Sequence, residues 1–216
     1  MSEKAKVTWG GGEVTAIIEG SGPVGVLVAH GAGTDQEHPS IVGIRTGIAG
    51  GGHTVMTFNY PYTERGSKSP DRQDRMLDCH RAAADHLAGH VDRVFLSGRS
   101  MGGRMGTYLA AEGYPASGLI LYAYPLHPAG KPEKLRVSQF PEIEIPMMFF
   151  QGTNDALSRM ELFNEHIAGL PNAEVELLEG AGHGYRGGGW DLESITDRYV
   201  NGSLTWIEQL SSGTSR

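Results

Sequence analysis

The chain of 216 residues is long enough for one well-packed domain and too short for two. Its hydrophobic share of 39% and charged share of 20% are those of an ordinary globular protein. With 18 basic against 25 acidic residues the net charge is −7, so the composition argues against general nucleic-acid binding and against attraction to anionic membranes.

We expect a cytoplasmic protein without disulfides. The first residues lead into a mixed polar segment that lacks the apolar core of a signal peptide. No run approaches the roughly 20 apolar residues of a transmembrane helix, so no membrane partner is expected. The chain has one cysteine, Cys79, which excludes an internal disulfide and fits a reducing compartment.

Apolar runs bounded by turn residues predict seven strands in chain order. Val24–Ala29 is the clearest, because it is apolar throughout and ends at His30, as a fully buried strand would. The predicted strands are Glu13–Glu19, Val24–Ala29, Thr54–Phe58, Val91–Ser97, Gly118–Ala123, Pro146–Phe150 and Glu174–Leu178.

Helical patterns lie between these strands. In the first of them, apolar residues recur at three- and four-residue spacing, which places Cys79 toward the core. Alternating strands and helices predict an α/β fold with a mostly parallel sheet covered on both faces. We expect a single domain over residues 1–216, with a flexible tail over 211–216. The predicted helices are Pro70–Ala88, Met101–Glu112, Met160–Ala168 and Asp191–Leu210.

The segment from Tyr124 to Glu144 interrupts this alternation. It contains four prolines and is too long for a tight connection, so we expect an irregular excursion near the strand ends. Because it is short, it leaves no room for a large lid over the sheet edge.

The strongest local signal is a G-x-S-x-G motif over residues 98–102. A buried strand precedes it and a helix follows directly. A serine on such a sharp turn is pushed out of the sheet toward a base, and the flanking glycines leave room where strand and helix approach closely. A chance match is the alternative in a chain with 32 glycines, but the strand–turn–helix context favours Ser100 as a nucleophile.

A serine nucleophile needs a base, and the base needs an orienting acid. Asp155 follows the sixth predicted strand and His183 follows the seventh, so with Ser100 they stand in the order nucleophile, acid, base at three strand ends. The alternative role for Asp155 is a turn residue or a helix cap. Asp191 and Asp197, the other acids near the histidine, are expected on or beside the last helix.

Residues 30–33 (HGAG) directly follow a buried strand. A loop there supplies one N–H of an oxyanion hole, and the residue after the nucleophile supplies the other. We therefore assign the backbone N–H groups of Ala32 and Met101. A dinucleotide site is the alternative, because a G-x-G pattern follows the strand. It is disfavoured because Gln36 stands in place of the third glycine and Asn59, not an acid, follows the next strand.

Several cations fall on loops expected at the active edge and stand out in a chain of net charge −7. A substrate carboxylate or phosphate could pair with one or two of them. The alternative is that each is a solvated loop residue. These candidate substrate-binding residues are Arg65, Lys68, Arg99, Lys131 and Arg186.

We expect neither a metal nor a cofactor. His86 and His90 have the spacing of a helical ligand pair, but no acid-flanked zinc motif accompanies them. A solvated helix face is the simpler interpretation of this pair.

These motifs together resemble one branch of the α/β-hydrolases, and the resemblance spans nearly the whole chain. That branch contains compact bacterial proteins labelled dienelactone-hydrolase-like, a testis-expressed hydrolase-like protein and a subunit of the non-specific lethal chromatin complex. The resemblance implies a mostly parallel sheet of about eight strands with one early antiparallel strand, and the triad assigned above. The matching segments are residues 30–33 (HGAG), 59–62 (NYPY), 98–104 (GRSMGGR), 151–155 (QGTND) and 182–184 (GHG).

The sequence departs from dienelactone hydrolase proper at the nucleophile, which is a cysteine in that enzyme and Ser100 here. We therefore expect a serine hydrolase that cleaves small or medium carboxylic esters or thioesters through an acyl-enzyme. One alternative is a non-catalytic interaction module, but scaffolds tend to lose triad members. Another is an acyl transferase or haloperoxidase-like enzyme that uses the same triad. The sequence leaves the oligomeric state open.

Overall fold

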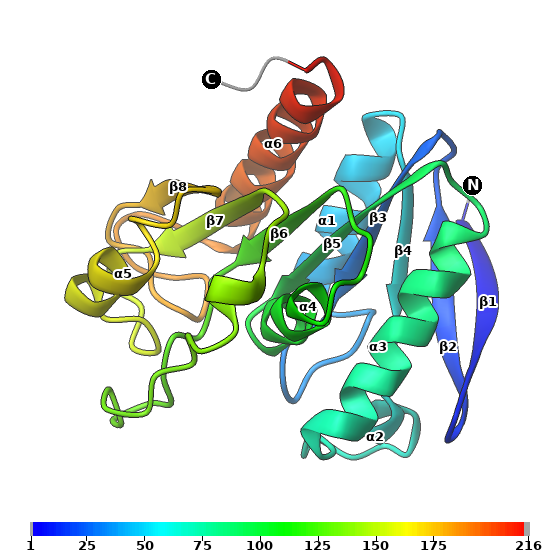
Figure 1. Cartoon of the computed structure of the whole chain (residues 1–216), viewed down its shortest axis with the longest axis horizontal. Coiled ribbons are helices and arrows are strands. Elements are labelled where there is room, and N and C mark those ends of the chain that lie inside the picture. The colour runs from blue at the N-terminus through cyan, green and yellow to red at the C-terminus, as the bar shows by residue number, and fades with distance from the viewer. Residues whose placement is uncertain (1, 214–216) are drawn as a thin grey trace.

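The sheet of the computed structural model, which describes residues 2–213, has eight strands in the order β1-β2-β4-β3-β5-β6-β7-β8 (Figure 1). Seven of them correspond to the predicted strands, with ends that differ by two residues or fewer. The strands are β1 (Ser2–Trp9), β2 (Gly12–Glu19), β3 (Val24–Ala29), β4 (Thr54–Phe58), β5 (Arg93–Arg99), β6 (Gly118–Tyr122), β7 (Met147–Gly152) and β8 (Ala173–Leu178).

One strand runs against all the others. β2 pairs antiparallel with both β1 and β4, whereas every pair from β4 across to β8 is parallel. This is the mostly parallel α/β sheet with one early antiparallel strand that the resemblance implies. Because parallel strands share a direction, the carboxyl ends of β3, β5, β7 and β8 meet at one edge, where loops can carry a site.

Helices cover both faces of this sheet (Figure 1). α1 and α6 pack together over one face, while α3 and α4 lie on the other. The two faces have separate apolar cores, as expected for a buried parallel sheet. The helices are α1 (Pro39–Gly50), α2 (Pro61–Glu64), α3 (Gln73–Ala88), α4 (Met101–Ala111), α5 (Met160–His166), α6 (Leu192–Ser211) and the 3-10 helix η1 (Phe140–Glu142).

The sequence pattern did not locate β1. The strand lies at the edge of the sheet, and most of its side chains are exposed, so it carries charges in place of an apolar run. Val7 is its one fully buried side chain. An edge strand of this kind resembles a polar loop in sequence.

The pattern also did not locate α1. Glycines inside a helix lower its intrinsic propensity by about 1 kcal/mol each relative to alanine. Here they allow close packing on α6: a Cβ atom on Gly43 would lie 2.7 Å from Thr196, and one on Gly47 would lie 2.6 Å from Val200. Tertiary packing therefore stabilises a helix that local preference does not predict.

The excursion between β6 and β7 is irregular, as expected, apart from η1. It is anchored to the core by Phe140 and Ile143, which are buried. No inserted lid lies among the residues that the structure describes. Cys79 is fully buried on α3, as its spacing predicted.

α6 continues through Ser211, the first residue of the tail that we expected to be flexible. Residues 214–216 of that tail lie outside the described residues. Within residues 2–213, no helix combines the length and the apolar character that crossing a bilayer would require.

Candidate active site

Ser100 lies on a sharp turn between β5 and α4. Its backbone has φ 52° and ψ −113°, a conformation that residues other than glycine rarely adopt. The turn is held by the Ser100 amide, which donates to the carbonyl oxygen of Tyr122 at 2.9 Å. A Cβ atom on Gly102 would lie 2.3 Å from the carbonyl oxygen of Ala29, so only glycine allows β3 and α4 to approach this closely.

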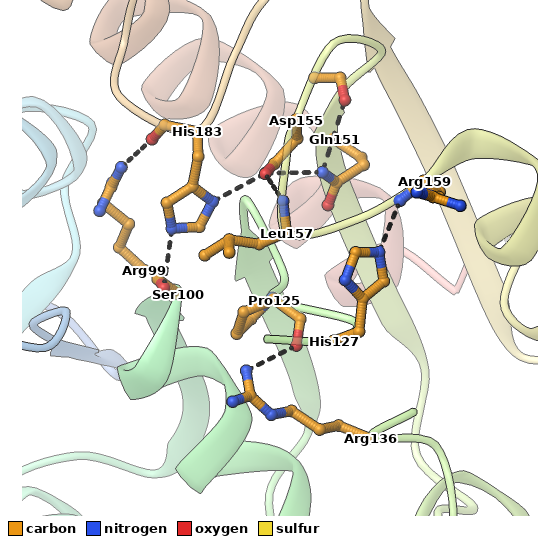
Figure 2. A network of polar contacts seen from close by, with 11 residues as sticks. Arg99, Ser100, Pro125, His127, Arg136, Gln151, Asp155, Leu157, Arg159 and His183 are labelled. Atoms are coloured by element: carbon orange, nitrogen blue, oxygen red, sulfur yellow. Dashed lines mark hydrogen bonds and ion pairs between the residues drawn. The ribbon is translucent and has the colours of Figure 1, made fainter. Parts of the chain in front are cut away.

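The imidazole of His183 reaches this serine from the loop after β8 (Figure 2). Its Nε2 atom lies 2.9 Å from Oγ of Ser100, and its Nδ1 atom lies 2.8 Å from Oδ2 of Asp155. Ser100 is 8% exposed, while the His183 side chain is 21% exposed. The two ring nitrogens therefore connect the serine to a carboxylate, and the histidine of this series is partly exposed to solvent.

The side chain of Asp155 is fully buried on the loop after β7. Its Oδ1 atom accepts a hydrogen bond from the backbone amide of Leu157 at 2.7 Å. This Asx-turn fixes the orientation of the carboxylate. Its Oδ2 atom accepts a hydrogen bond from Nε2 of Gln151 at 3.0 Å in addition to the imidazole contact (Figure 2). A carboxylate held by three donors keeps a fixed orientation toward the histidine.

Sequence reasoning assigned no role to Gln151. This residue is fully buried at the end of β7, four residues before the acid. The available signal was a long amide in an otherwise apolar strand, because a buried polar side chain needs a partner. In the structure that partner is Asp155.

The loop at residues 30–33 lies beside the nucleophile turn: a Cβ atom on Gly31 would lie 3.8 Å from Cβ of Ser100. The backbone N–H of Ala32 in this loop and that of Met101, the first residue of α4, donate no hydrogen bond to the described residues. Helices leave their first N–H groups without internal partners. Two amides from the two expected positions are therefore available beside Ser100.

The Gly31 carbonyl oxygen is held by three side chains. It accepts from Nδ1 of His30 and from Oγ1 of Thr34, both at 2.9 Å, and from the hydroxyl of Tyr62 at 3.4 Å. This oxygen belongs to the same planar peptide unit as the N–H of Ala32, which points the opposite way. Fixing the carbonyl therefore fixes the direction of that amide.

His30 is neutral in this arrangement. Nδ1 faces a carbonyl and so carries the proton, while Nε2 accepts the amide of Tyr60 at 3.2 Å. Burial lowers the pKa of His30 to about 4. A second buried histidine, His80, lies 2.9 Å from the hydroxyl of Tyr60, and burial lowers its pKa to about 3.

Arg99, one of the expected substrate-binding cations, binds the loop that carries His183. Its Nη2 atom donates to the main-chain oxygen of His183 (Figure 2), and its guanidinium carbon lies 4.0 Å from the centre of the Tyr185 ring. Tyr185 has φ 63° and places its hydroxyl 2.5 Å from Oγ of Ser40. The nucleophile turn, the histidine loop and α1 are joined through these contacts.

The other expected cations are arranged differently. Arg65 forms an ion pair with Asp71 at 2.6 Å and also donates to the carbonyl oxygen of Pro61. Lys68, Lys131 and Arg186 are exposed, with no ion pair among the described residues. Of the five predicted cations, Arg99 and Arg65 therefore already have partners within the described residues, while the other three side chains are exposed.

The alternative site residues lie outside this hydrogen-bond network. Asp191 caps α6, where its side chain accepts the amide of Ser194 at 2.8 Å. His86 and His90 pack ring against ring, with centroids 5.2 Å apart. Across residues 2–213, no three metal-ligating side chains of His, Cys, Asp or Glu gather in one place.

A family model described as an alpha/beta hydrolase domain matches residues 23–207 of the chain. Solved structures show the same fold. An α/β serine hydrolase without a lid from Xanthomonas campestris is 19% identical, with a TM-score of 0.75 over 95% of this chain and 94% of that chain. A cold-adapted esterase from an Arctic intertidal metagenomic library is 18% identical, with a TM-score of 0.71 over 96% and 93%. A candidate dienelactone hydrolase from Klebsiella pneumoniae is 17% identical, with a TM-score of 0.73 over 97% and 98%.

Proposed function

The chain belongs to the alpha/beta hydrolase family, and on that premise we propose that it is a serine hydrolase of small or medium carboxylic esters or thioesters. The observation that carries the proposal is the hydrogen-bonded series Ser100–His183–Asp155, with distances of 2.9 and 2.8 Å. A serine, a base and an orienting acid in contact are the parts that acyl transfer needs.

In the proposed reaction, Oγ of Ser100 attacks the acyl carbon while Nε2 of His183 takes its proton. The imidazolium then gives that proton to the leaving alcohol or thiol, and the acyl group stays on the serine. Water enters, His183 takes one of its protons, and the acid is released with the serine restored. Asp155 keeps Nδ1 protonated and stabilises the imidazolium without being protonated itself.

Negative charge develops on the acyl oxygen in both steps. We assign its stabilisation to the backbone N–H groups of Ala32 and Met101, which lie beside Ser100 and donate to no described residue. Both donors are held in place before substrate binds, the first through the Gly31 carbonyl and the second by the start of α4. Pre-aligned donors need no reorganisation when charge appears.

The open edge favours short acyl groups. A lid would bury a long acyl chain, and each buried methylene contributes about 0.8 kcal/mol. Without that cover, longer chains gain little affinity. We therefore expect activity on 4-nitrophenyl esters of graded length to be highest for short and medium acyl groups.

A fluorophosphonate probe tests the proposal directly, because it reacts with an activated serine. We expect stoichiometric labelling of the peptide that contains Ser100, located by mass spectrometry, and no labelling of the Ser100→Ala variant. Hydrolysis of 4-nitrophenyl acetate should disappear in the same variant. Label on another serine, or none on the folded wild type, would exclude this assignment and favour an interaction module.

A further inference from the structure

Two arginines close to the nucleophile have no carboxylate partner. The first is Arg104, one turn after Ser100 on α4, with its amide donating to the Ser100 carbonyl oxygen at 3.0 Å. Residues four apart lie on the same helix face, and long helical side chains lean toward the N-terminus. From this position we expect the Arg104 side chain to extend toward the turn that carries the nucleophile. Its Nε atom is buried without a hydrogen-bond partner.

The second is Arg136, which comes from the excursion between β6 and β7. Its Nη1 atom donates to the carbonyl oxygen of Pro125 at 3.2 Å, and its own carbonyl accepts the hydroxyl of Tyr124 at 2.7 Å. Pro125 stands three residues after Tyr122, whose carbonyl oxygen accepts the amide of Ser100. In Figure 2 the Arg136 side chain reaches back from the excursion toward the start of α4.

The charge of Arg104 acts on Arg136. Burial lowers the pKa of Arg136, and the neighbouring charge of Arg104 lowers it further. Neither arginine forms an ion pair with any described residue, although the chain has 25 acidic side chains. Six other arginines do form such pairs, whereas Arg93, Arg99, Arg159 and Arg186 also form none among the described residues; the paired ones are Arg45, Arg65, Arg72, Arg75, Arg81 and Arg198.

Two half-buried like charges destabilise one another unless an anion lies between or beside them. We propose that Arg104 and Arg136 form a subsite for a carboxylate on the acyl part of the substrate, an inference that rests on the proposed hydrolase function. Guanidiniums bind carboxylates through paired, charge-assisted hydrogen bonds.

The position of the two arginines indicates that the bound carboxylate belongs to the acyl part of the substrate and not to its leaving group. The leaving group receives its proton from His183 and so departs on the side of that imidazole. In Figure 2 the guanidinium of Arg136 lies on the side of Ser100 away from His183. In the proposed arrangement, a substrate bound at Ser100 extends its acyl chain toward Arg136.

Two substrates that differ only in charge test this subsite: mono-4-nitrophenyl adipate and its methyl ester. We expect the wild type to prefer the anion. Arg104→Gln and Arg136→Gln should each raise the KM for the anion by about tenfold or more, the contribution of a lost charged hydrogen bond, and leave the methyl ester unchanged. Lys134→Gln removes an exposed cation of the same excursion and should change neither substrate.

Fluorophosphonate labelling of each variant confirms that its serine is intact, and Arg104→Lys should restore part of the preference. Equal changes on both substrates, or no preference for the anion in the wild type, would overturn the subsite.

A binding measurement separates this inference from the hydrolase itself. Adipate should bind to the Ser100→Ala variant in a calorimetric titration, whereas its neutral diamide should not. The double variant Ser100→Ala, Arg104→Gln should lose adipate binding by tenfold or more. Adipate binding without any ester hydrolysis by the wild type would refute the proposed function and leave the subsite standing. Hydrolysis of neutral esters without adipate binding would refute the subsite alone.

Discussion

The guanidinium of Arg99 donates a hydrogen bond to the main-chain oxygen of His183, so the residue before the nucleophile holds the loop that carries the base. The same guanidinium packs on the ring of Tyr185, two residues further along that loop. The sequence suggested that Arg99 binds substrate. From these contacts we propose that Arg99 is a positioning residue, and the two roles have different kinetic consequences.

Replacing Arg99 with Gln should lower kcat by about tenfold or more and leave KM nearly unchanged, because the imidazole loses its fixed position while the substrate site stays intact. Steady-state kinetics with 4-nitrophenyl acetate measure this split. Arg72→Gln, at an exposed site, is the matched control. A rise in KM at constant kcat would return Arg99 to the substrate-binding role.

Replacing Asp155 with Asn should lower kcat by about four orders of magnitude, because an amide cannot hold Nδ1 protonated and leaves the imidazole in the wrong tautomer. The melting temperature should change little. Asp191→Asn is the comparison, since asparagine caps helices as well as aspartate does. A large loss of turnover in Asp191→Asn, with Asp155→Asn active, would show that the acid has been misassigned.

Replacing Thr34 with Val removes one donor from the Gly31 carbonyl and so loosens the peptide that carries the Ala32 amide. We expect kcat to fall, by less than the roughly 100-fold that follows loss of an entire oxyanion donor. KM should hold, because the ground-state ester needs this amide less than the tetrahedral intermediate does. Thr205→Val, on the exposed face of α6, should leave both constants unchanged. Unaltered kcat in Thr34→Val would remove the threonine from this role.

The buried histidines predict acid sensitivity. The folded-state pKa values of His30 and His80, about 4 and about 3, lie below the ordinary value of 6.5. Below pH 6.5 the unfolded chain binds protons at these two histidines, whereas the folded chain does not. The contribution of the two histidines to the free energy of unfolding should therefore be complete above pH 6.5 and should decrease as the pH drops toward 4.

Urea unfolding at a series of pH values measures this slope. His80→Asn, which keeps a hydrogen-bonding group near Tyr60, should reduce it by up to about 1.4 kcal/mol per pH unit, the value of one proton. Thr205→Val, on the exposed face of α6, removes no titratable group and should leave the slope as it is. An identical slope in wild type and His80→Asn would contradict the prediction.

The parts of the fold and site that the sequence predicts are those encoded locally. Strands β3 to β7 are apolar because both of their faces are buried, whereas β8, at the edge of the sheet, carries Glu174 and Glu176 and is only partly buried. Ser100, Asp155 and His183 follow β5, β7 and β8, and because these strands are parallel, their carboxyl ends bring the three residues to one edge. Their mutual distances of 2.8 and 2.9 Å agree with that expectation.

The remaining features depend on packing between distant segments. Arg136 comes near the nucleophile only because of the path that the excursion takes, and no local pattern encodes that path. Arg65 has the same residue type on a loop, yet it pairs with Asp71 six residues away. The sequence shows that cations are present near the active edge, whereas the partner of each one is decided by the folded chain.

Because Cys79 is buried, we expect the folded protein not to react with thiol reagents. Burial raises the pKa of this thiol to about 12, so at neutral pH almost none of it is the reactive thiolate. A cysteine introduced at an exposed position, such as Lys131→Cys on the excursion, would then be the one thiol that maleimides modify in the folded state. A fluorophore attached to the introduced cysteine would thus report movement of the excursion during turnover without labelling of Cys79.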